Sequence, residues 1–342
     1  MRRVAGPDEL PGALVAGAAE ALAAFGDGAV YLEREITPAR HIEVQLLGDV
    51  QGAIVAIGER DCSLQRRHQK LVEEAPAPNL SEDERRDLHA TAVRAARAVG
   101  LVNAATAEFL FDEDRRFWFL EVNTRLQVEH GVTELVYDVD IVREQLWIAA
   151  GYALSERVLA AAARAGRPTR HAIEVRLSAE DPGRSFAPAP GTIGRWEMPS
   201  GPGVRVDTAV EAGSRVAPDY DPLIAKVMVV DETRPAAIDR LARALAETTI
   251  TGIQTTLPFH RFVAADAGFR SGPLSIDWVD GNWAAVGEGL RRTALETARE
   301  LAAAAVGWDV ERARAEPARA AEDAGDAWSR AGRAAVVERW PR

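Results

Sequence analysis

The sequence predicts an α/β fold of the α+β kind, in which antiparallel strands alternate with separate helices. Its 342 residues are enough for two compact domains, and 47% hydrophobic with 27% charged residues is typical of soluble globular proteins. Short stretches of alternating polar and apolar residues, bounded by turn residues, predict the strands. Ala-rich stretches with capping signals predict the helices.

The N-terminal part begins with a predicted helix from Asp8 to Phe25, which Gly26 closes. The charge-dense run from Glu59 to Lys70 is expected to be irregular. Three strands are expected between these two segments, at Val30 to Arg34, His41 to Gly48 and Ala53 to Gly58.

The second of these strands alternates between apolar and polar residues, so its two faces differ. Apolar Ile42, Val44 and Leu46 share one face. The other face carries a polar row that looks away from the core and can line a cleft, formed by His41, Glu43 and Gln45.

Ser81 and Glu84 have the spacing of a capping box, which predicts a helix that ends near Gly100. Two strands joined by a short acidic turn follow, Ala105 to Phe111 and Phe117 to Val122. These strands are expected to form a hairpin.

The second half is predicted to be richer in strands and turns, after a helix from about Asp140 to Ala150. The Ala- and Arg-rich segment from Ser155 to Arg170 is expected to separate two domains. Ala, Arg and Glu at helical spacing predict appended helices from 284 to 342. The other expected elements are strands at His171 to Ser178, Val204 to Asp207 and Leu223 to Val230, and helices at Pro235 to Ala246 and from near Pro258.

Charge and cysteine content exclude several classes of protein. The net charge of -11 argues against nonspecific nucleic-acid binding, because DNA repels an acidic surface. The single cysteine, Cys62, cannot form an internal disulfide. No stretch has the pattern of a membrane span or a signal peptide, so a cytoplasmic location is expected.

Lysine is rare in this chain. Of 41 Lys and Arg residues only Lys70 and Lys226 are lysines, so arginine serves nearly everywhere a solvated cation is needed. An ammonium group is a compact point charge on a flexible stem, which suits it to follow a small anion through a reaction. These two positions are candidates for a specific role, and a surface lysine kept by chance is the alternative.

The predicted hairpin suggests a metal site. A turn centred between Asp114 and Arg115 places Glu108 opposite Glu121, and like charges about 5 Å apart destabilise a sheet unless a cation neutralises them. Asn123 lies two residues further on, which completes a ligand set that suits Mg²⁺ or Mn²⁺. The alternative is an exposed acidic ladder in a register shifted by one.

Polar residues continue beyond this hairpin with period two, which predicts that they lie along one extended edge. A cation beside a carboxylate is what binding and deprotonating a small oxyanion requires. The run from Glu59 to Lys70 adds arginines, a histidine and a lysine within an acidic chain, which creates local positive potential for an anion. A polar edge strand and a solvated charged loop are the alternatives. The period-two residues are Glu121, Asn123, Arg125, Gln127 and Glu129, ending at His130.

Two long runs read ERDCSLQRRHQKLVEEAPAP at Glu59 to Pro78 and FLEVNTRLQVEH at Phe119 to His130. They are similar to signature motifs of biotin carboxylases, which are ATP-grasp enzymes, and of the biotin carboxylase subunits of acyl-CoA carboxylases. The resemblance covers roughly Met1 to Trp283. It continues through AIEVRLSAEDP at Ala172 to Pro182, YDPLIAK at Tyr220 to Lys226 and GIQTTLPFHR at Gly252 to Arg261.

The resemblance implies a partial ATP-grasp domain with an antiparallel sheet over 1–154, a biotin carboxylase C-terminal domain over 168–283 and a helical tail over 284–342. It implies that Mg²⁺ or Mn²⁺ on ATP is held by Glu108 and Glu121, with Asn123 nearby. Nucleotide contacts implied by position are Glu33, Ile36, His41, Gln65 and His68. The implied bicarbonate site consists of Lys70, Arg125, Gln127 and Val128.

In the family reaction that the resemblance implies, Glu129 deprotonates bicarbonate, which attacks the γ-phosphate of ATP to give carboxyphosphate. This breaks down to CO₂ and phosphate, phosphate takes the ureido proton, and biotin N1 is carboxylated. Arg176 is implied to stabilise the biotin enolate, and a fixed guanidinium does so only as charge develops. Carrier domains present the lysine that bears biotin between two methionines, and neither lysine of this chain has such neighbours. Biotin is therefore expected on a separate biotin carboxyl carrier protein.

The other implied partners are a carboxyltransferase subunit, as in an acetyl-CoA or propionyl-CoA carboxylase, and further copies in a homo-oligomer. Residues 1–4 match the position just after the family's glycine-rich loop, so we expect the isolated chain to turn over ATP poorly. Two alternatives remain open. One is a non-catalytic scaffold, and the other is a different ATP-grasp ligase such as a carbamoyl-phosphate-forming enzyme, against which Arg176 argues.

Overall fold

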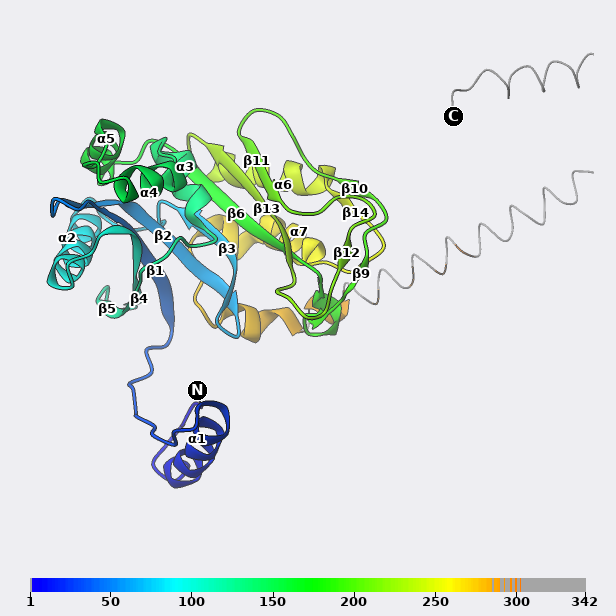
Figure 1. The fold of residues 1–342 in the computed structure, drawn as a ribbon. Helices are drawn as coiled ribbons and strands as arrows, with labels where there is room; N and C mark the ends of the chain where they lie inside the picture. The colour runs from blue at the N-terminus through cyan, green and yellow to red at the C-terminus, as the bar shows by residue number, and fades with distance from the viewer. Residues whose placement is uncertain are drawn as a thin grey trace, which may run out of the picture. The chain divides into compact units, whose positions relative to one another are not determined.

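One antiparallel sheet of eight strands carries the groups that the sequence singles out. In this computed structural model the strand order is β11-β13-β6-β3-β2-β1-β4-β5 (Figure 1). The structure describes residues 2–284, 286–289, 292, 296, 299 and 302. The strands are β1 Ala39–Gly48, β2 Ile54–Arg66, β3 Gln69–Ala75, β4 Asn103–Asp112, β5 Phe117–Asn123, β6 His171–Ser178, β11 Val204–Thr208 and β13 Leu223–Asp231.

Strands from both expected domains belong to this sheet, because β3 from the first pairs with β6 from the second. Residues up to Ala284 form one compact unit. The predicted tail over 284–342 lies outside the described residues, apart from 284, 286–289, 292, 296, 299 and 302, which are helical. Paired two-residue strands at the second half are β7 Glu180–Asp181 with β8 Ala187–Pro188, β9 Gly191–Thr192 with β12 Arg215–Val216, and β10 Trp196–Glu197 with β14 Thr249–Ile250.

The helices follow the sequence signals at most of their ends. The capping box at Ser81 and Glu84 is present at the start of α2, and Gly26 closes α1 in the left-handed conformation. None of the residues of α1 is buried. The helices are α1 Leu10–Phe25, α2 Glu82–Ala98, α3 His130–Tyr137, α4 Ile141–Ala149, α5 Glu156–Arg164, α6 Arg234–Glu247, α7 Leu257–Ala265 and α8 Ala267–Ser271, with a 3-10 turn at Pro182–Arg184.

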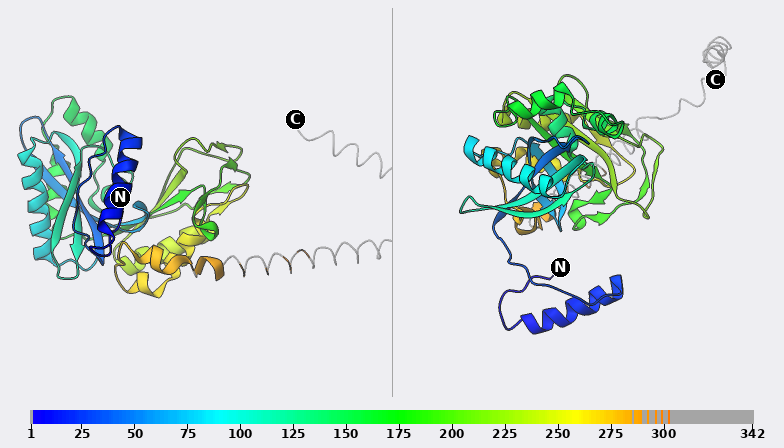
Figure 2. Two further views of the ribbon diagram at one scale, coloured as in Figure 1. Left: turned by 90° about the horizontal axis from the view of Figure 1, so that it is seen from below. Right: turned by 60° about the vertical axis from the view of Figure 1, so that its left-hand side comes forward.

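Helices cover both faces of the sheet. Helices α3, α4 and α5 pack on one face, which we call the α3 face, and α2 and α6 pack on the opposite one, which we call the α2 face (Figure 1). Helix α2, coloured cyan, lies beside the blue strands in both views of Figure 2. Burial on both faces explains why β1 is buried along nearly its whole length.

The alternation predicted for β1 decides which core each residue joins. Ile42, Val44 and Leu46 pack with Leu88 and other apolar residues of α2. On the α3 face, Leu47 joins a second core with residues of α3, α4 and α5. The polar row of β1 also lies on the α3 face and is buried: His41 is 7%, Glu43 0% and Gln45 1% exposed.

Three expectations from the sequence are wrong. Residues 30–34 form no strand, because nothing in the described part of the chain pairs with them. The run from Glu59 to Lys70 is not irregular: β2 continues unbroken to Arg66, and β3 begins at Gln69. Its charged side chains are tolerated inside the sheet because partners in distant segments neutralise them.

The third error concerns the segment after β5. The period-two residues do not form one extended edge, because β5 ends at Asn123 and the chain turns into α3 at His130. This turn lays residues 124–131 on the α3 face. Among the described residues, no helix has both the length and the apolar character needed to cross a bilayer.

Candidate active site

Lys70 lies at the centre of a buried cluster of charges on the α3 face. Its Nζ atom donates hydrogen bonds to Glu43 Oε2 at 2.5 Å, Glu129 Oε1 at 2.7 Å and Glu108 Oε1 at 3.1 Å. Burial alone lowers the pKa of Lys70, but the surrounding carboxylates outweigh it and raise that pKa above its usual value. Lys70 is therefore a permanent cation at the junction of three acidic side chains.

A β-bulge aims Lys70 into this cluster. Leu64 pairs with Val72, whereas the next residue, Gln65, pairs with Lys70, so Leu71 is an extra residue in β3. Simple alternation would place Lys70 on the same face as Val72 and Glu74, which is the α2 face. The extra residue reverses the direction of the side chain, as bulges beside functional sites do.

The β4–β5 hairpin brings Glu108 and Glu121 together as predicted. These residues are partners in register, as are Thr106 and Asn123. The turn is centred on Asp114 instead of between Asp114 and Arg115, and a one-residue register shift between Glu108 and Phe109 compensates for this difference. The predicted pairing is thus confirmed, although the geometry that produces it includes an irregularity that the sequence reasoning did not foresee.

The groups around Glu108 fit a divalent cation. His41 Nε2 lies 3.0 Å from Glu108 Oε2, and the Asn123 amide donates to Glu108 at 3.1 Å and to Glu121 at 2.9 Å. Burial raises the pKa of Glu108, but hydrogen bonding to His41 and the charges of His41 and Lys70 lower it to about 2. Glu108 is thus ionised at neutral pH. Metal ligation by Asn123 requires its amide oxygen, so that the group must turn over from the orientation seen.

Glu129 has the surroundings of a positioned base. It is 1% exposed and accepts hydrogen bonds from Lys70 and, through Oε2, from Arg176 Nη2 at 2.9 Å. Arg176 also donates to Glu73 Oε1 at 2.6 Å. Two cations from different strands therefore fix one carboxylate at the edge of the cluster, where a small oxyanion can reach both charges.

The segment 124–129 connects the metal-type carboxylates to this base. Arg125 is exposed, and it donates to Gln127 Oε1 at 2.9 Å. Gln127 is buried, and the carbonyl oxygen of Val128 accepts a hydrogen bond from Lys226 Nζ at 2.7 Å. Three of the four predicted bicarbonate residues thus lie along one short turn beside Glu129, and the fourth, Lys70, reaches Glu129 from β3.

The predicted nucleotide residues are placed less tightly. Glu33 is exposed and Ile36 half-buried in a segment without secondary structure, and His68 is exposed at the β2–β3 turn. Gln65 is buried and pairs with Lys70 across that hairpin. Within the described residues, no hydrogen bond or ion pair joins Glu33, Ile36 or His68 to the charged cluster.

Sequence reasoning missed the buried groups that support the cluster. Arg60 is 0% exposed and donates to Glu43 Oε1 at 2.5 Å. It also donates to Gln45, Thr133 and Thr106. Burial raises the pKa of Glu43, but Arg60 and Lys70 lower it to about 2. The sequence did contain one signal for these groups. Glu43 lies in the polar row of β1, and a carboxylate buried there needs a buried cation on a neighbouring strand to neutralise it.

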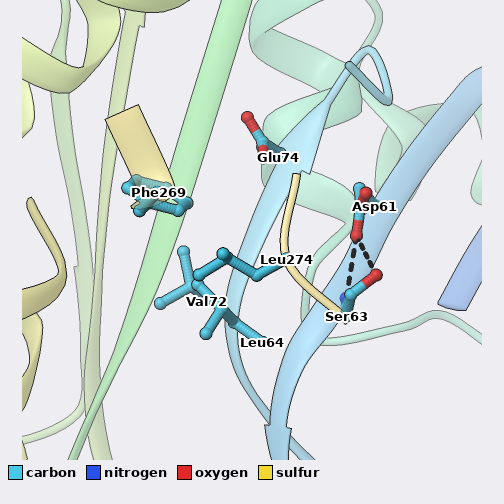
Figure 3. Close-up of a pocket in the computed structure, with 7 residues that line it drawn as sticks. All are labelled: Asp61, Ser63, Leu64, Val72, Glu74, Phe269 and Leu274. Carbon is cyan, nitrogen blue, oxygen red and sulfur yellow. Dashed lines mark hydrogen bonds between the residues drawn. The ribbon is translucent and has the colours of Figure 1, made fainter. Parts of the chain in front are cut away.

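Two hollows lie outside this cluster. A crevice on the α2 face has a volume of about 10 Å³, room for one water molecule, and Asp61 and Ser63 are hydrogen-bonded at its wall (Figure 3). An open groove of about 650 Å³ runs along α3 and α4, between Leu135, Leu146 and Arg205. Neither hollow contains the residues that the sequence predicts for catalysis.

Comparisons with known proteins find relatives for both halves of the chain. A family model described as the ATP-binding domain of the carbamoyl-phosphate synthase L chain matches residues 1–157, and one described as the biotin carboxylase C-terminal domain matches residues 174–281. The chain is 46% identical over 281 residues to biotin carboxylase 2 of Bacillus subtilis, covering 82% of this chain and 62% of that one.

Solved structures give the same result. The chain is similar to a biotin carboxylase of Campylobacter jejuni in complex with βγ-ATP, with a TM-score of 0.77, 41% identity and coverage of 82% of this chain and 62% of that one. It is also similar to the biotin carboxylase domain dimer of Hydrogenobacter thermophilus 2-oxoglutarate carboxylase with MgADP, ADP and bicarbonate. There the TM-score is 0.75, the identity 41%, and the coverage 80% and 59%. The chain thus spans about three fifths of the length of the relatives it matches.

Proposed function

The chain belongs to the biotin carboxylase family, and from this we propose that the protein carboxylates biotin with bicarbonate at the expense of ATP. The observation that carries the proposal is the position of Glu129. This carboxylate is held between Lys70 and Arg176, next to the paired carboxylates of the β4–β5 hairpin. A base, two cations and a metal-type pair are the groups that such a reaction needs.

Each of these residues has a step in the proposed reaction. Lys70 and Arg125 attract bicarbonate, and Glu129 accepts its proton as the bicarbonate oxygen attacks the terminal phosphorus of ATP and ADP leaves. Arg176 then stabilises the negative charge that develops on the ureido oxygen of biotin. A divalent cation held by Glu108, Glu121 and Asn123 supplies charge neutralisation at the phosphates.

The remaining assignments belong to the same proposal. Nucleotide contacts come from Glu33, Ile36, His41, Gln65 and His68, and bicarbonate contacts from Gln127 and Val128 as well. Residues 1–154 are proposed as part of an ATP-grasp domain, and 168–283 as the C-terminal domain. The proposed partners are a biotin carboxyl carrier protein, a carboxyltransferase subunit and a second copy of the chain. The dimer of the related Hydrogenobacter domain supports the last of these.

Metal-dependent nucleotide binding is the first test. We expect calorimetry to show that MgADP binds the chain and that chelating the metal weakens binding at least about tenfold. The double variant Glu108→Gln/Glu121→Gln should remove that metal dependence. The control variant Glu82→Gln/Asp83→Asn also removes two negative charges, at exposed positions of α2, and should keep the metal dependence. Nucleotide binding that ignores the metal in the unsubstituted chain would contradict the proposal.

Biotin-dependent turnover is the second test. ADP release should depend on both bicarbonate and free biotin, and Glu129→Gln should lower it by roughly 10²-fold or more, because the base is lost. The same variant should still bind MgADP. A chain that binds MgADP yet releases no ADP, with added biotin and bicarbonate, favours the scaffold alternative. ADP release that needs bicarbonate but not biotin favours a different ATP-grasp ligase.

A further inference from the structure

Lys226, the second of the two lysines, has an unusual environment for a cation. It lies on β13 and is 8% exposed. Its ammonium donates to the carbonyl oxygen of Val128 at 2.7 Å and lies 3.3 Å from Asp207 Oδ2 and 3.7 Å from Glu174 Oε2. The shortest of these contacts is made to the backbone of the segment that carries the base.

Packing alone does not account for a lysine here. Burying an ammonium group is costly, and an apolar side chain of similar length is usually at least as stable at such a position. Lys226 is also the register partner of Arg176, so two cations stand side by side on the α3 face. Adjacent like charges destabilise a sheet, and the cost has to be offset by what the two groups bind.

The two cations hold consecutive residues of one segment. Arg176 binds the carboxylate of Glu129, and Lys226 binds the carbonyl of Val128, directly before it. The ionised carboxylate of Asp207, on β11 opposite Lys226, balances the second cation: burial raises the pKa of Asp207, and hydrogen bonding and charge from Arg205 and Lys226 outweigh it. The segment is thereby attached to β6 through a side chain and to β13 through its backbone.

Gly131 shows how closely the segment rests on β13. A Cβ atom at this position would lie 2.3 Å from Met228 Sδ, so any larger residue would force the Met228 side chain to move. Met228 is two residues from Lys226 on the same strand and the same face. Contacts on both sides of Glu129 therefore fix its backbone against the C-terminal part of the sheet.

We propose that Lys226 is a positioning residue for bicarbonate binding, which acts by holding the Val128 carbonyl and so fixing the turn from Arg125 to Glu129. The proposal rests on the proposed function, because it assigns that turn to bicarbonate. A small anion makes few contacts, and a shift of about 1 Å in the groups that bind it is enough to weaken them strongly. Nucleotide binding, which uses other elements, is independent of this hold.

Three variants separate positioning from stability. Lys226→Met removes the ammonium and keeps the chain length. Lys226→Met/Glu174→Gln also removes the carboxylate that the first change leaves without a cation, which keeps the test valid if the single variant folds poorly. The matched control is Arg234→Met. The Arg234 side chain is 13% exposed and pairs with Glu74 on the α2 face, so it does not contact this turn.

The first measurement is amide hydrogen exchange of residues 126–131 in the chain without ligands. We expect exchange about tenfold faster in both Lys226 variants, as the loss of one hydrogen bond from a charged donor predicts, and no change in Arg234→Met. This measurement does not depend on the proposed function. Exchange in the Lys226 variants equal to that of the control would overturn the proposal.

The second measurement is the affinity for ¹³C-labelled bicarbonate, from NMR titration in the presence of MgADP. We expect the Kd for bicarbonate to rise about tenfold in both Lys226 variants, while the Kd for MgADP stays within about twofold. Equal losses for both ligands, or an unchanged bicarbonate Kd, would reject a positioning role. If the unsubstituted chain binds no bicarbonate, the proposed function fails, and the exchange measurement still decides whether Lys226 holds the turn.

Discussion

Glu73 and Glu74 are neighbours on β3, yet they point to opposite faces of the sheet and differ in their electrostatics. Both carboxylates are buried, at 0% and 5% exposed, and each accepts hydrogen bonds from an arginine. The pKa of Glu73 is raised to about 7, whereas that of Glu74 is lowered to about 2. Similar burial and a similar partner therefore give opposite outcomes.

Their neighbours explain the difference. Burial raises the pKa of both groups. Glu74, on the α2 face, is bound by His171 Nε2 at 2.8 Å and by Arg234 at 2.7 Å, which together outweigh burial. Glu73, on the α3 face, has Arg176, but it also lies near Glu129 and opposite Glu174 in register. Burial and the charge of Glu73 likewise raise the pKa of Glu174.

On the α3 face carboxylates share their cations: Arg176 binds both Glu73 and Glu129, and Lys70 binds three carboxylates, whereas Glu74 has two partners to itself. Such local conflict is typical of functional sites, where stability is given up for chemistry. The conflict on the α3 face lies beside Glu129, the proposed base, and beside the pair Glu108 and Glu121, the proposed metal ligands. The five buried carboxylates of the cluster are Glu43, Glu73, Glu108, Glu129 and Glu174, and the groups that pair with them are Arg60, Lys70, Arg176, Lys226 and His41.

If the α3 face is this crowded with carboxylates, losing a cation there should cost more than losing one on the α2 face. Arg60→Met removes a fully buried guanidinium from Glu43, and we expect it to lower the free energy of unfolding by about 3–5 kcal/mol. Urea unfolding measures this loss. Arg234→Met, which removes the partly exposed partner of Glu74, should cost less. An Arg60 variant more stable than the Arg234 variant would contradict the comparison.

The α2 face should show its pairing in the acid range. Glu74 has a folded pKa of about 2 against an ordinary value of 4.5, so its stabilisation is complete above pH 4.5 and is lost as the pH falls towards 2. Glu74→Gln should therefore be less stable than the unsubstituted chain by about 3 kcal/mol at pH 7. Urea unfolding at a series of pH values should show that this difference shrinks between pH 4.5 and 2.

A matched control for this measurement is Glu82→Gln, at an exposed position in the first turn of α2. It removes the same charge without a buried pair, and we expect little change in the pH dependence. A difference between Glu74→Gln and the unsubstituted chain that stays constant down to pH 2 would mean that Glu74 is not held as an ion by His171 and Arg234.

Short-range patterns in the sequence predicted the elements of the sheet but not the environment of its charges. The Ser81–Glu84 capping box and the pairing of Glu108 with Glu121 depend on residues close in the chain, and both are present. The charged run after Glu59 was wrongly expected to be irregular, since the residues that neutralise its charges are distant in the sequence. Arg60 pairs with Glu43, and Glu59 pairs with Arg85 on α2.

The expectation for the segment after Asn123 was wrong for the same reason. Period two grouped Arg125, Gln127 and Glu129, which lie on one turn, but this turn leaves the strand, and residues on β6 and β13 bind it. Lys226 is 98 residues from Val128 in the sequence. No local pattern shows that two residues so far apart in the sequence lie on the same face of the sheet. The rarity of lysine was therefore the only sequence signal for the role proposed for Lys226.

The smallest expected effect has the opposite sign and gives the sharpest comparison of the two faces. Because the folded pKa of Glu73, about 7, exceeds 4.5, its ionised form disfavours the fold, and this penalty grows as the pH rises from 4.5 through 7. Glu73→Gln imitates the protonated acid but leaves Arg176 with Glu129 as its remaining carboxylate partner. We expect these effects to offset each other, so that unfolding free energies at pH 8 differ by only about 1 kcal/mol.

The direction of the pH dependence is what distinguishes the two neighbours. The stability advantage of the unsubstituted chain over Glu73→Gln should fall as the pH rises from 4.5 to 7, whereas its advantage over Glu74→Gln should rise between pH 2 and 4.5. Urea unfolding at matched ionic strength measures both slopes. If the advantage over Glu73→Gln also rises with pH, then Arg176 outweighs burial and the nearby carboxylates, and the α3 face is as well balanced as the α2 face.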